Sequence, residues 1–406
     1  RARRQRERVF FLHLKVCFCR REVTGGKQMN GKIGVQAFSM LLAVLLVSMV
    51  LVPAVSAEAQ TDASVDLDQY TIPDLKMDRS IEPIAISGML CLQEVPDKAE
   101  SGTYGIPFGS IVVHAADGIT RVFDKDGDQL LSISDGRSKK IPTPAGVEKP
   151  CTWVHQIPDD SRAYYRGDTI FVLNPAGELV LLIINEDTTS KSCPESTRGW
   201  TDHDWLESAE DYLNGITEYT AYWTVPSAPP SLEDDEMIYL FNVIQGDTPS
   251  PYLLQPVIRY NPQQQRWEGQ AWGCDPDGPD VIGSTITLST GDSMKGRIYW
   301  DSGRNLWFIS LEDRTTGQAS VTTTNYIQPQ SNCLVACALE GWYVDDNTDV
   351  PGDTNFYSMS YKTYGVPMMN VHLDPWYSSF APQEIISQCF VEIIQNPYQV
   401  VLHTAN

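Results

Sequence analysis

Two polar side chains lie inside stretches of sequence that are otherwise apolar. Gln255 lies in "PYLLQPVIRY" and is followed directly by Pro256, and Glu340 lies in "ACALEGWYVDD". A buried amide without a partner costs about 1 to 3 kcal/mol, and a free carboxylate in an apolar strand costs more. Proline donates nothing to a strand ladder, so the run around Pro256 is expected at a sheet edge or a bulge. We therefore expect both side chains to be either paired or functional.

The position of Glu340 in its strand indicates which neighbours it has. On alternate positions of a regular strand, Glu340, Trp342 and Val344 share one face, and Asp345 points to the other. If that face meets Gln255 on a neighbouring strand, an acid and an amide converge in an aromatic cleft. Tyr239, Trp267 and Trp272 would then wall a substrate cleft together with Trp342, although sandwich core and strand pairing explain these aromatic residues equally well.

Several familiar catalytic motifs are absent from the sequence. It contains no Gly-x-Ser-x-Gly, no His-Glu-x-x-His and no phosphate loop. The "DSG" at 301–303 resembles the aspartic peptidase triplet, but that chemistry needs two such aspartates, and this copy is expected to be a tight turn. Cys333 and Cys337 have the spacing of a metal pair without a matching second pair, so we expect no metal and no cofactor.

The elements that must hold these residues are expected to be strands. Residues 216–406 contain many alternating or aromatic-rich runs separated by Gly, Pro, Asp or Asn. So many short strands without helices between them predict an all-β fold, a sandwich or barrel of antiparallel sheets. Residues 81–187 show the same punctuation, with hairpin turns at 126–127 and 174–177, and predict a smaller β-rich N-terminal domain.

The two β regions are expected to be connected by a linker at 188–215. Within it, "TDHDWLESAEDYLNG" has Trp205, Leu206, Ala209 and Leu213 at helical spacing and ends in glycine, which predicts a short amphipathic helix. Residues 58–80 are polar without a sustained period and are expected to form a loosely held arm.

The beginning of the chain has the features of an export signal. Residues 1–28 have no period that suits a folded domain and are interpreted as an upstream translation artefact. Residues 29–57 have one positive charge, an apolar run and small residues ending in "VSA", which predicts a signal peptide cleaved after Ala57. The alternative is an uncleaved anchor; in both cases the remainder is expected outside the cell.

Loss of residues 1–57 leaves 20 basic and 50 acidic residues, a net charge of −30. Such a chain is a poor partner for nucleic acid and anionic lipid, and we expect no membrane insertion after signal cleavage. The acidic excess favours solubility, and it also suits exposure to low pH, where many carboxylates are protonated.

Seven cysteines remain after the predicted cleavage. In an exported protein they are expected to form disulfides, with one cysteine left over. They are Cys91, Cys151, Cys193, Cys274, Cys333, Cys337 and Cys389.

The order of several segments in residues 216–406 resembles that of the eqolisins, a family of glutamic peptidases. These segments are "YTAYWTVP" (219–226), "YLFNVIQGD" (239–247), "YLLQPVIRY" (252–260), "ITLSTGDS" (286–293), "LEDRTTGQ" (311–318), "CALEGWYVDD" (337–346) and "VEIIQNPYQV" (391–400). The "EGW" at 340–342 is also similar, more weakly, to the Glu-Ala-Gly-Trp run of plant neprosins, which use a glutamate there.

The resemblance implies a secreted acid endopeptidase folded as a sandwich of two antiparallel sheets, a concanavalin-like jelly roll. It implies a catalytic dyad of Gln255 and Glu340 acting on a polypeptide substrate. Ionised Glu340 would take a proton from the attacking water, and the Gln255 amide would donate to the developing oxyanion. The family is made with a propeptide, so residues 81–187 are expected to cover the cleft, with a release site between 186 and 198.

A non-catalytic interpretation stays open at this point. Antiparallel sandwiches also bind glycans or protein partners, and a fold alone does not fix function. Gln255 and Glu340 on opposite faces of a sheet would favour that alternative.

Overall fold

The computed structural model describes most of the chain after its first sixty-four residues. The chain divides into two compact units, Arg1–Gln60 and Thr61–Asn406, and every described residue belongs to the second. The described residues are 65–93, 102–186, 200–208, 215–233, 236–246, 252–329, 333–363, 371–377 and 388–404. The predicted signal peptide and the predicted release site at 186–198, apart from Glu186, therefore lie outside them.

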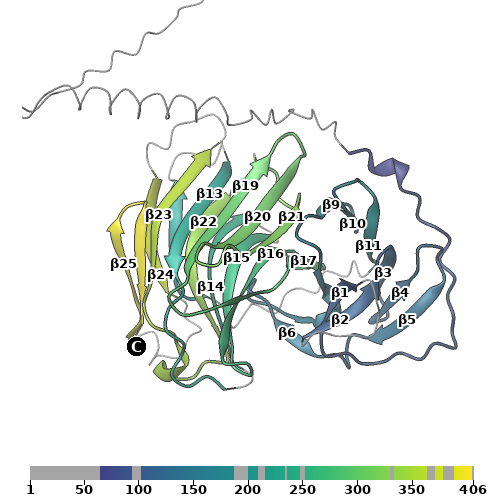
Figure 1. Ribbon diagram of the computed structural model, residues 1–406, viewed down its shortest axis with the longest axis horizontal. Helices are drawn as coiled ribbons and strands as arrows, with labels where there is room; N and C mark the ends of the chain where they lie inside the picture. The colour runs from purple at the N-terminus through teal and green to yellow at the C-terminus, as the bar shows by residue number, and fades with distance from the viewer. Residues whose placement is uncertain are drawn as a thin grey trace, which may run out of the picture. The chain divides into compact units, whose positions relative to one another are not determined.

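The described chain is all-β, as the sequence predicted (Figure 1). Two sheets form a sandwich. The larger has the order β2 (Thr103–Pro107), β1 (Met89–Gln93), β8 (Val154–Gln156), β17 (Asp280–Ile282), β16 (Arg266–Cys274), β15 (Leu253–Asn261), β14 (Met237–Gly246), β22 (Cys333–Trp342), β12 (Trp200–Ser208) and β24 (Val371–Tyr377), with β18 (Ile286–Leu288) beside β16. The smaller has the order β21 (Ala319–Thr324), β20 (Leu306–Asp313), β19 (Ser293–Asp301), β13 (Ile216–Thr224), β23 (Thr354–Thr363), β26 (Gln399–His403) and β25 (Phe390–Gln395).

The main core lies between these two sheets and follows the alternation of the strands. Leu254 and Ile258 of β15 pack in it, together with Trp223 of β13 and Trp307 of β20. The odd-numbered residues of β15 face the other way, and Val257 packs there with Phe241 of β14 in a second cluster. Because successive side chains of a strand point to opposite faces, the large sheet is apolar on both sides.

The N-terminal region forms its own sheet and also extends the larger sheet of the sandwich. Its own sheet has the order β5 (Gln129–Ser134), β4 (Ile119–Phe123), β3 (Ser110–Ala115), β11 (Leu179–Asn185), β10 (Thr169–Leu173) and β9 (Arg162–Arg166). The β4–β5 and β10–β11 hairpins have the predicted turns. β8 pairs in parallel with both β1 and β17, so the predicted domain limit at 187 does not separate the sheets.

The segment expected to be a loose arm is bonded to the N-terminal sheet where it is described. The Tyr70 hydroxyl donates to the Gly177 carbonyl at 2.5 Å, and the Lys76 N–H donates to the Gly127 carbonyl at 2.8 Å. A single 3-10 turn, Leu67–Gln69, breaks this extended segment. Two further 3-10 turns follow, Cys151–Trp153 and Asn347–Asp349.

The prediction of a helix within 188–215 is wrong for the part of this segment that the structure describes. Residues 200–208 form β12, which pairs with β22 on one side and β24 on the other. Ladder hydrogen bonds on both edges outweigh the helical spacing, because propensity is a weak prior that tertiary context overrides.

The prediction of disulfides is not confirmed. Within the described part of the chain no disulfide is present, and Cys151 and Cys274 are buried thiols. Among the same residues, no helix has the length and apolar character needed to cross a membrane.

Candidate functional site

The structure brings Gln255 and Glu340 to the same face of the larger sheet. Gln255 lies on β15 and Glu340 on β22, with β14 between the two strands. In register, Glu340 is opposite Tyr239 of β14, and Gln255 is opposite Trp272 of β16. Alternation puts both polar side chains on the face of the second apolar cluster, away from the core between the sheets.

Gln255 is fully buried, and both ends of its amide are bonded. Its Nε2 donates to the carbonyl oxygen of Pro144 at 2.7 Å, and its Oε1 accepts from the Cys274 thiol at 3.5 Å. Burial raises the pKa of the Cys274 thiol well above its usual value, which keeps it a neutral donor. The amide orientation is therefore fixed, with its N–H group directed at a peptide carbonyl.

Glu340 is also fully buried, with one carboxylate oxygen held and the other open. Its Oε1 accepts from the indole Nε1 of Trp342 at 2.6 Å, and its Oε2 has no hydrogen-bond partner among the described residues. Burial raises the pKa of Glu340 to about 8, while the Trp342 indole and the backbone N–H of Gly146 act to lower it. The group is thus a neutral acid near pH 7 as long as it stays covered.

Both side chains are covered by one tight turn of the N-terminal region, residues 143–147. Pro144 supplies the carbonyl to Gln255, and Gly146 lies at Glu340. Beside the turn, the Tyr239 hydroxyl donates to the Pro142 carbonyl at 2.9 Å, and Ala145 packs on the apolar cluster around the site. A peptide segment therefore occupies the position between the amide and the acid.

The covering turn is fixed by local chemistry. The backbone N–H and the hydroxyl of Thr143 both donate to the Val147 carbonyl, at 3.0 and 2.9 Å, and the Gly146 N–H donates to the Thr143 carbonyl at 3.1 Å. Gly146 has φ of 73°, a conformation that glycine adopts without steric cost. Strands β6 (Lys140–Pro142) and β7 (Glu148–Pro150) pair on either side of the turn and make it the tip of a hairpin, the covering hairpin 140–150.

A buried lysine anchors this hairpin to the sandwich. The Lys149 ammonium donates to the carbonyls of Asp275 and Gly278 and to Oδ1 of Asp280, at 2.5, 2.9 and 2.6 Å. Burial raises the pKa of Asp280 to about 6, against the opposing effect of Lys149. Tyr165 of β9 adds a bond of 2.7 Å to the Asp275 carboxylate. All three ammonium protons are used, so the anchor is specific.

The predicted aromatic wall divides between the two faces of the sheet. Tyr239, Trp272 and Trp342 lie on the face of Gln255 and are buried there. Trp267 lies in the core between the sheets and does not line the site, and Val344 lies in that core too. The strand ends at Trp342 and Tyr343 has φ of 62°, so the alternation predicted through Val344 stops there.

The N-terminal region and one charged group on the sheet contribute to the site without having been predicted from the sequence. Lys149 and the turn at 143–147 come from far along the chain, and only "TPAG" signals a turn there. Arg259 is opposite Tyr239 in register and forms an ion pair with Glu268 at 2.9 Å. The period of β15 puts Arg259 on the face of Gln255, and this could have been inferred from the sequence.

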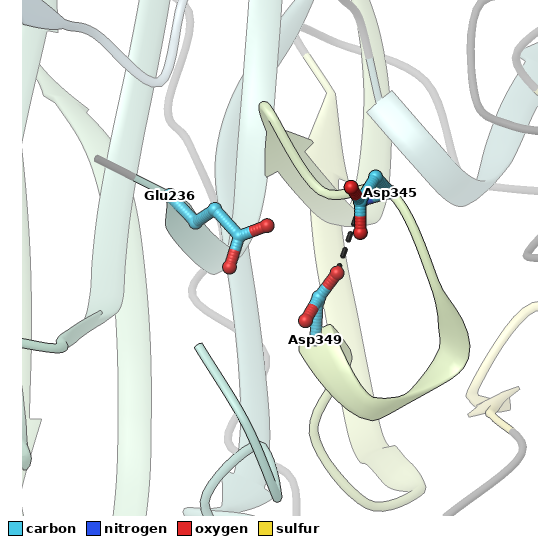
Figure 2. A group of neighbouring side chains, drawn as sticks. All are labelled: Glu236, Asp345 and Asp349. Carbon is cyan, nitrogen blue, oxygen red and sulfur yellow. Dashed lines mark hydrogen bonds between the residues drawn. The ribbon is translucent and has the colours of Figure 1, made fainter. Parts of the chain in front are cut away.

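Three carboxylates gather at the end of the sheet, where Figure 2 shows Glu236 facing Asp345 and Asp349. Their candidate ligand atoms lie within 4.8 Å of one another. Asp349 accepts from the backbone N–H groups of Asp345 and Asp346, and Glu236 accepts from that of Glu233. Burial, followed by the nearby aspartates, raises the pKa of Glu236 to about 7. These bonds explain the cluster as the cap of a turn, and we assign no cation to it.

Comparison with known proteins gives matches among solved structures only. No family model and no curated protein matches the chain. A scytalidoglutamic peptidase with a transition state analog inhibitor is 15% identical, with a TM-score of 0.36 over 51% of this chain and 98% of that one. SCP-B, a member of the eqolisin family in complex with the tripeptide Ala-Ile-His, is 14% identical, with a TM-score of 0.33 over the same shares.

A third match is the CBM2 module of an evolved Dit of Lactobacillus casei BL23 phage J-1. It is 9% identical, with a TM-score of 0.28 over 39% of this chain and 66% of that one. Eqolisin structures are thus among those that the chain resembles, as the sequence predicted. At these identities and TM-scores the likeness transfers no residue's role to this chain.

Proposed function

We propose that the chain is the precursor of a secreted acid endopeptidase of glutamic type. In the released enzyme Glu340 is the general base that activates a water, and Gln255 donates to the oxyanion. In the precursor the turn at 143–147 occupies the site. No metal or cofactor takes part in this chemistry.

One observation carries the proposal: the Gln255 amide already donates to a peptide carbonyl, that of Pro144, at 2.7 Å. The amide is thus directed at the kind of oxygen on which negative charge develops when water attacks a peptide, which supports its proposed role as the oxyanion donor. Glu340 meets the same turn at Gly146, two residues after Pro144. One of its carboxylate oxygens has no partner among the described residues and is available for the proton of a water.

The covering turn also explains why the precursor would be inactive. A peptide that is cleaved binds extended, whereas residues 143–147 are closed by three hydrogen bonds into a turn. The turn excludes water from Glu340 and keeps its pKa near 8. When the N-terminal region leaves, water returns to the carboxyl group and its pKa falls toward its usual value of about 4.3, which suits work at acid pH.

The alternative of a glycan-binding or partner-binding sandwich has less support. Gln255 and Glu340 lie on one face of the sheet, so the arrangement that would favour this alternative, with the two side chains on opposite faces, is not found. Tyr239, Trp272 and Trp342 are buried beneath the N-terminal region and present no open aromatic platform.

Proteolysis of a denatured protein by residues 58–406 tests the proposal. After acid incubation, we expect cleavage at acid pH that persists with pepstatin and is lost in Gln255→Ala and Glu340→Gln. Gln270→Ala is the matched control, because Gln270 is a buried amide on the same face whose side-chain atoms have no partner among the described residues. Activity retained by the two site variants would refute the dyad.

A further inference from the structure

Glu340 and Trp342 form a bonded pair on β22. They are two residues apart, so they share one face of the strand. The indole Nε1 of Trp342 donates to Glu340 Oε1 at 2.6 Å, and both side chains are almost completely buried. This hydrogen bond restricts the buried carboxyl group to one orientation.

We propose that Trp342 is a positioning residue for Glu340, which holds one carboxylate oxygen and leaves the other to take the proton of the attacking water. The inference rests on the proposed function. The sequence alone places Trp342 in the wall of the substrate cleft. Its bond to Glu340 gives it a different task, since the indole acts through the carboxyl group and does not need to touch the substrate.

The asymmetry of the two carboxylate oxygens supports this role. Oε1 is bonded to the indole, and Oε2 is buried without a partner among the described residues. Holding one oxygen fixes the direction of the other, which is the requirement for a base that must meet a water in a defined position. The indole N–H also favours the ionised carboxylate and so opposes the effect of burial on the pKa of Glu340.

If the Trp342 ring only packs in the apolar cluster, loss of its N–H group should leave the pKa of Glu340 unchanged. Trp342 packs in the apolar cluster on this face of the sheet, in register with Met237. Trp342→Phe keeps an aromatic ring in the cluster and removes only the N–H donor and part of the volume. Trp223→Phe is the matched control, because Trp223 is fully buried between the sheets and its Nε1 has no partner among the described residues.

The first readout is the titration of Glu340 in the precursor, which needs no catalysis. Carbon-13 NMR of glutamate carboxyl groups follows it, with the signal assigned by its loss in Glu340→Gln. In Trp342→Phe the midpoint is expected to rise by about half a unit to one unit, because the ionised form loses a hydrogen bond. In Trp223→Phe it stays at the wild-type value. A midpoint that does not move in Trp342→Phe overturns the pairing.

The second readout is the pH profile of the released enzyme. Trp342→Phe should lower kcat about tenfold with little change in KM, and the acid limb of kcat should move to higher pH. A wild type that cleaves no substrate overturns the proposed function, and with it the catalytic meaning of the pair. An active wild type with the same profile and kcat as Trp342→Phe overturns the positioning role alone.

Discussion

The carboxyl group of Glu340 is completely buried in the precursor, whereas its proposed role as a general base requires contact with water. Burial, the largest effect on it, raises its pKa to about 8, and the indole of Trp342 offsets only a part. A buried group with a single firm hydrogen bond is costly when it ionises. Ionisation of Glu340 therefore costs free energy in the precursor, and the released enzyme would not bear this cost.

This cost of ionisation predicts that the stability of Glu340→Gln relative to wild type depends on pH. The pKa of Glu340 is higher in the folded precursor than in the unfolded chain, so its contribution to stability is present below the unfolded pKa and is lost as the pH rises through 8. Glutamine resembles the protonated form and escapes this loss. At pH 8 we expect Glu340→Gln to be more stable than wild type by on the order of 4 kcal/mol relative to the difference at pH 4.

Urea unfolding of the two proteins at both pH values measures the difference. Glu82→Gln, a substitution at an exposed glutamate, controls for the loss of one charge. An equal difference between wild type and Glu340→Gln at both pH values would contradict the raised pKa.

At the scale of elements, the covering hairpin 140–150 depends on an ion pair. Lys149 and Asp280 are both buried, and Asp280 Oδ2 has no partner among the described residues. Removing one member of a buried pair leaves an uncompensated charge, which typically costs about 3 to 5 kcal/mol. Loss of Lys149 alone would therefore destabilise the contact between the hairpin and the sandwich.

Lys149→Met is expected to destabilise the precursor by about 3 kcal/mol or more and to speed the release of the N-terminal region at acid pH. Adding Asp280→Asn to that variant removes the stranded charge and should recover a large part of the loss. Denaturant unfolding and the rate of release, followed by intact mass, measure both effects. A single variant within 0.5 kcal/mol of wild type, the range of ordinary surface changes, would show that the hairpin is held by other contacts.

The predictability of these elements from sequence was uneven for physical reasons. Alternation alone predicted the strands of residues 216–406, and it also puts Trp267 and Trp272 on opposite faces of β16, since they are five residues apart. The helix predicted near Trp205 failed because pairing on both edges of β12 decides that segment. The covering turn was beyond sequence reasoning, because its contact with Gln255 joins residues 111 positions apart.

At the scale of the whole molecule, a buried histidine pair lies near the junction of the N-terminal strands and the sandwich. His155 of β8 is in register with Leu90 of β1 and Val281 of β17. Its Nε2 is 3.0 Å from Nε2 of His114, whose Nδ1 bonds to Thr120 at 2.9 Å. Thr120 in turn donates to the buried carboxylate of Asp135. Burial lowers the pKa of His155 to about 3, so the ring is neutral in the fold.

Acid should therefore weaken this junction. Below about pH 6.5 an unfolded chain protonates His155, whereas the folded chain does so only near pH 3, so stability falls with pH through this window. His155→Gln removes that dependence, and between pH 7 and pH 4 wild type should lose on the order of 3 kcal/mol more than the variant.

The pH series of urea unfolding that measures this has a control of opposite sign. The pKa of His403 is raised by its bonds to Glu392 and Asp353, against the effect of burial, so this histidine supports stability at acid pH. His403→Gln should accordingly lose more than wild type on acidification. If His155→Gln and wild type lose stability in parallel, the junction is not the acid-sensitive part of the molecule.

The central claim is that Glu340 is the general base for peptide cleavage once the turn at 143–147 no longer covers it. The most direct test incubates residues 58–406 at acid pH and follows intact mass and cleavage of a denatured substrate in the same samples, for wild type and Glu340→Gln. Wild type is predicted to be cut between residues 186 and 198 and to gain activity in step with that cut, while Glu340→Gln gains none. A chain that is fully active while uncut, or a Glu340→Gln variant as active as wild type, would contradict the claim.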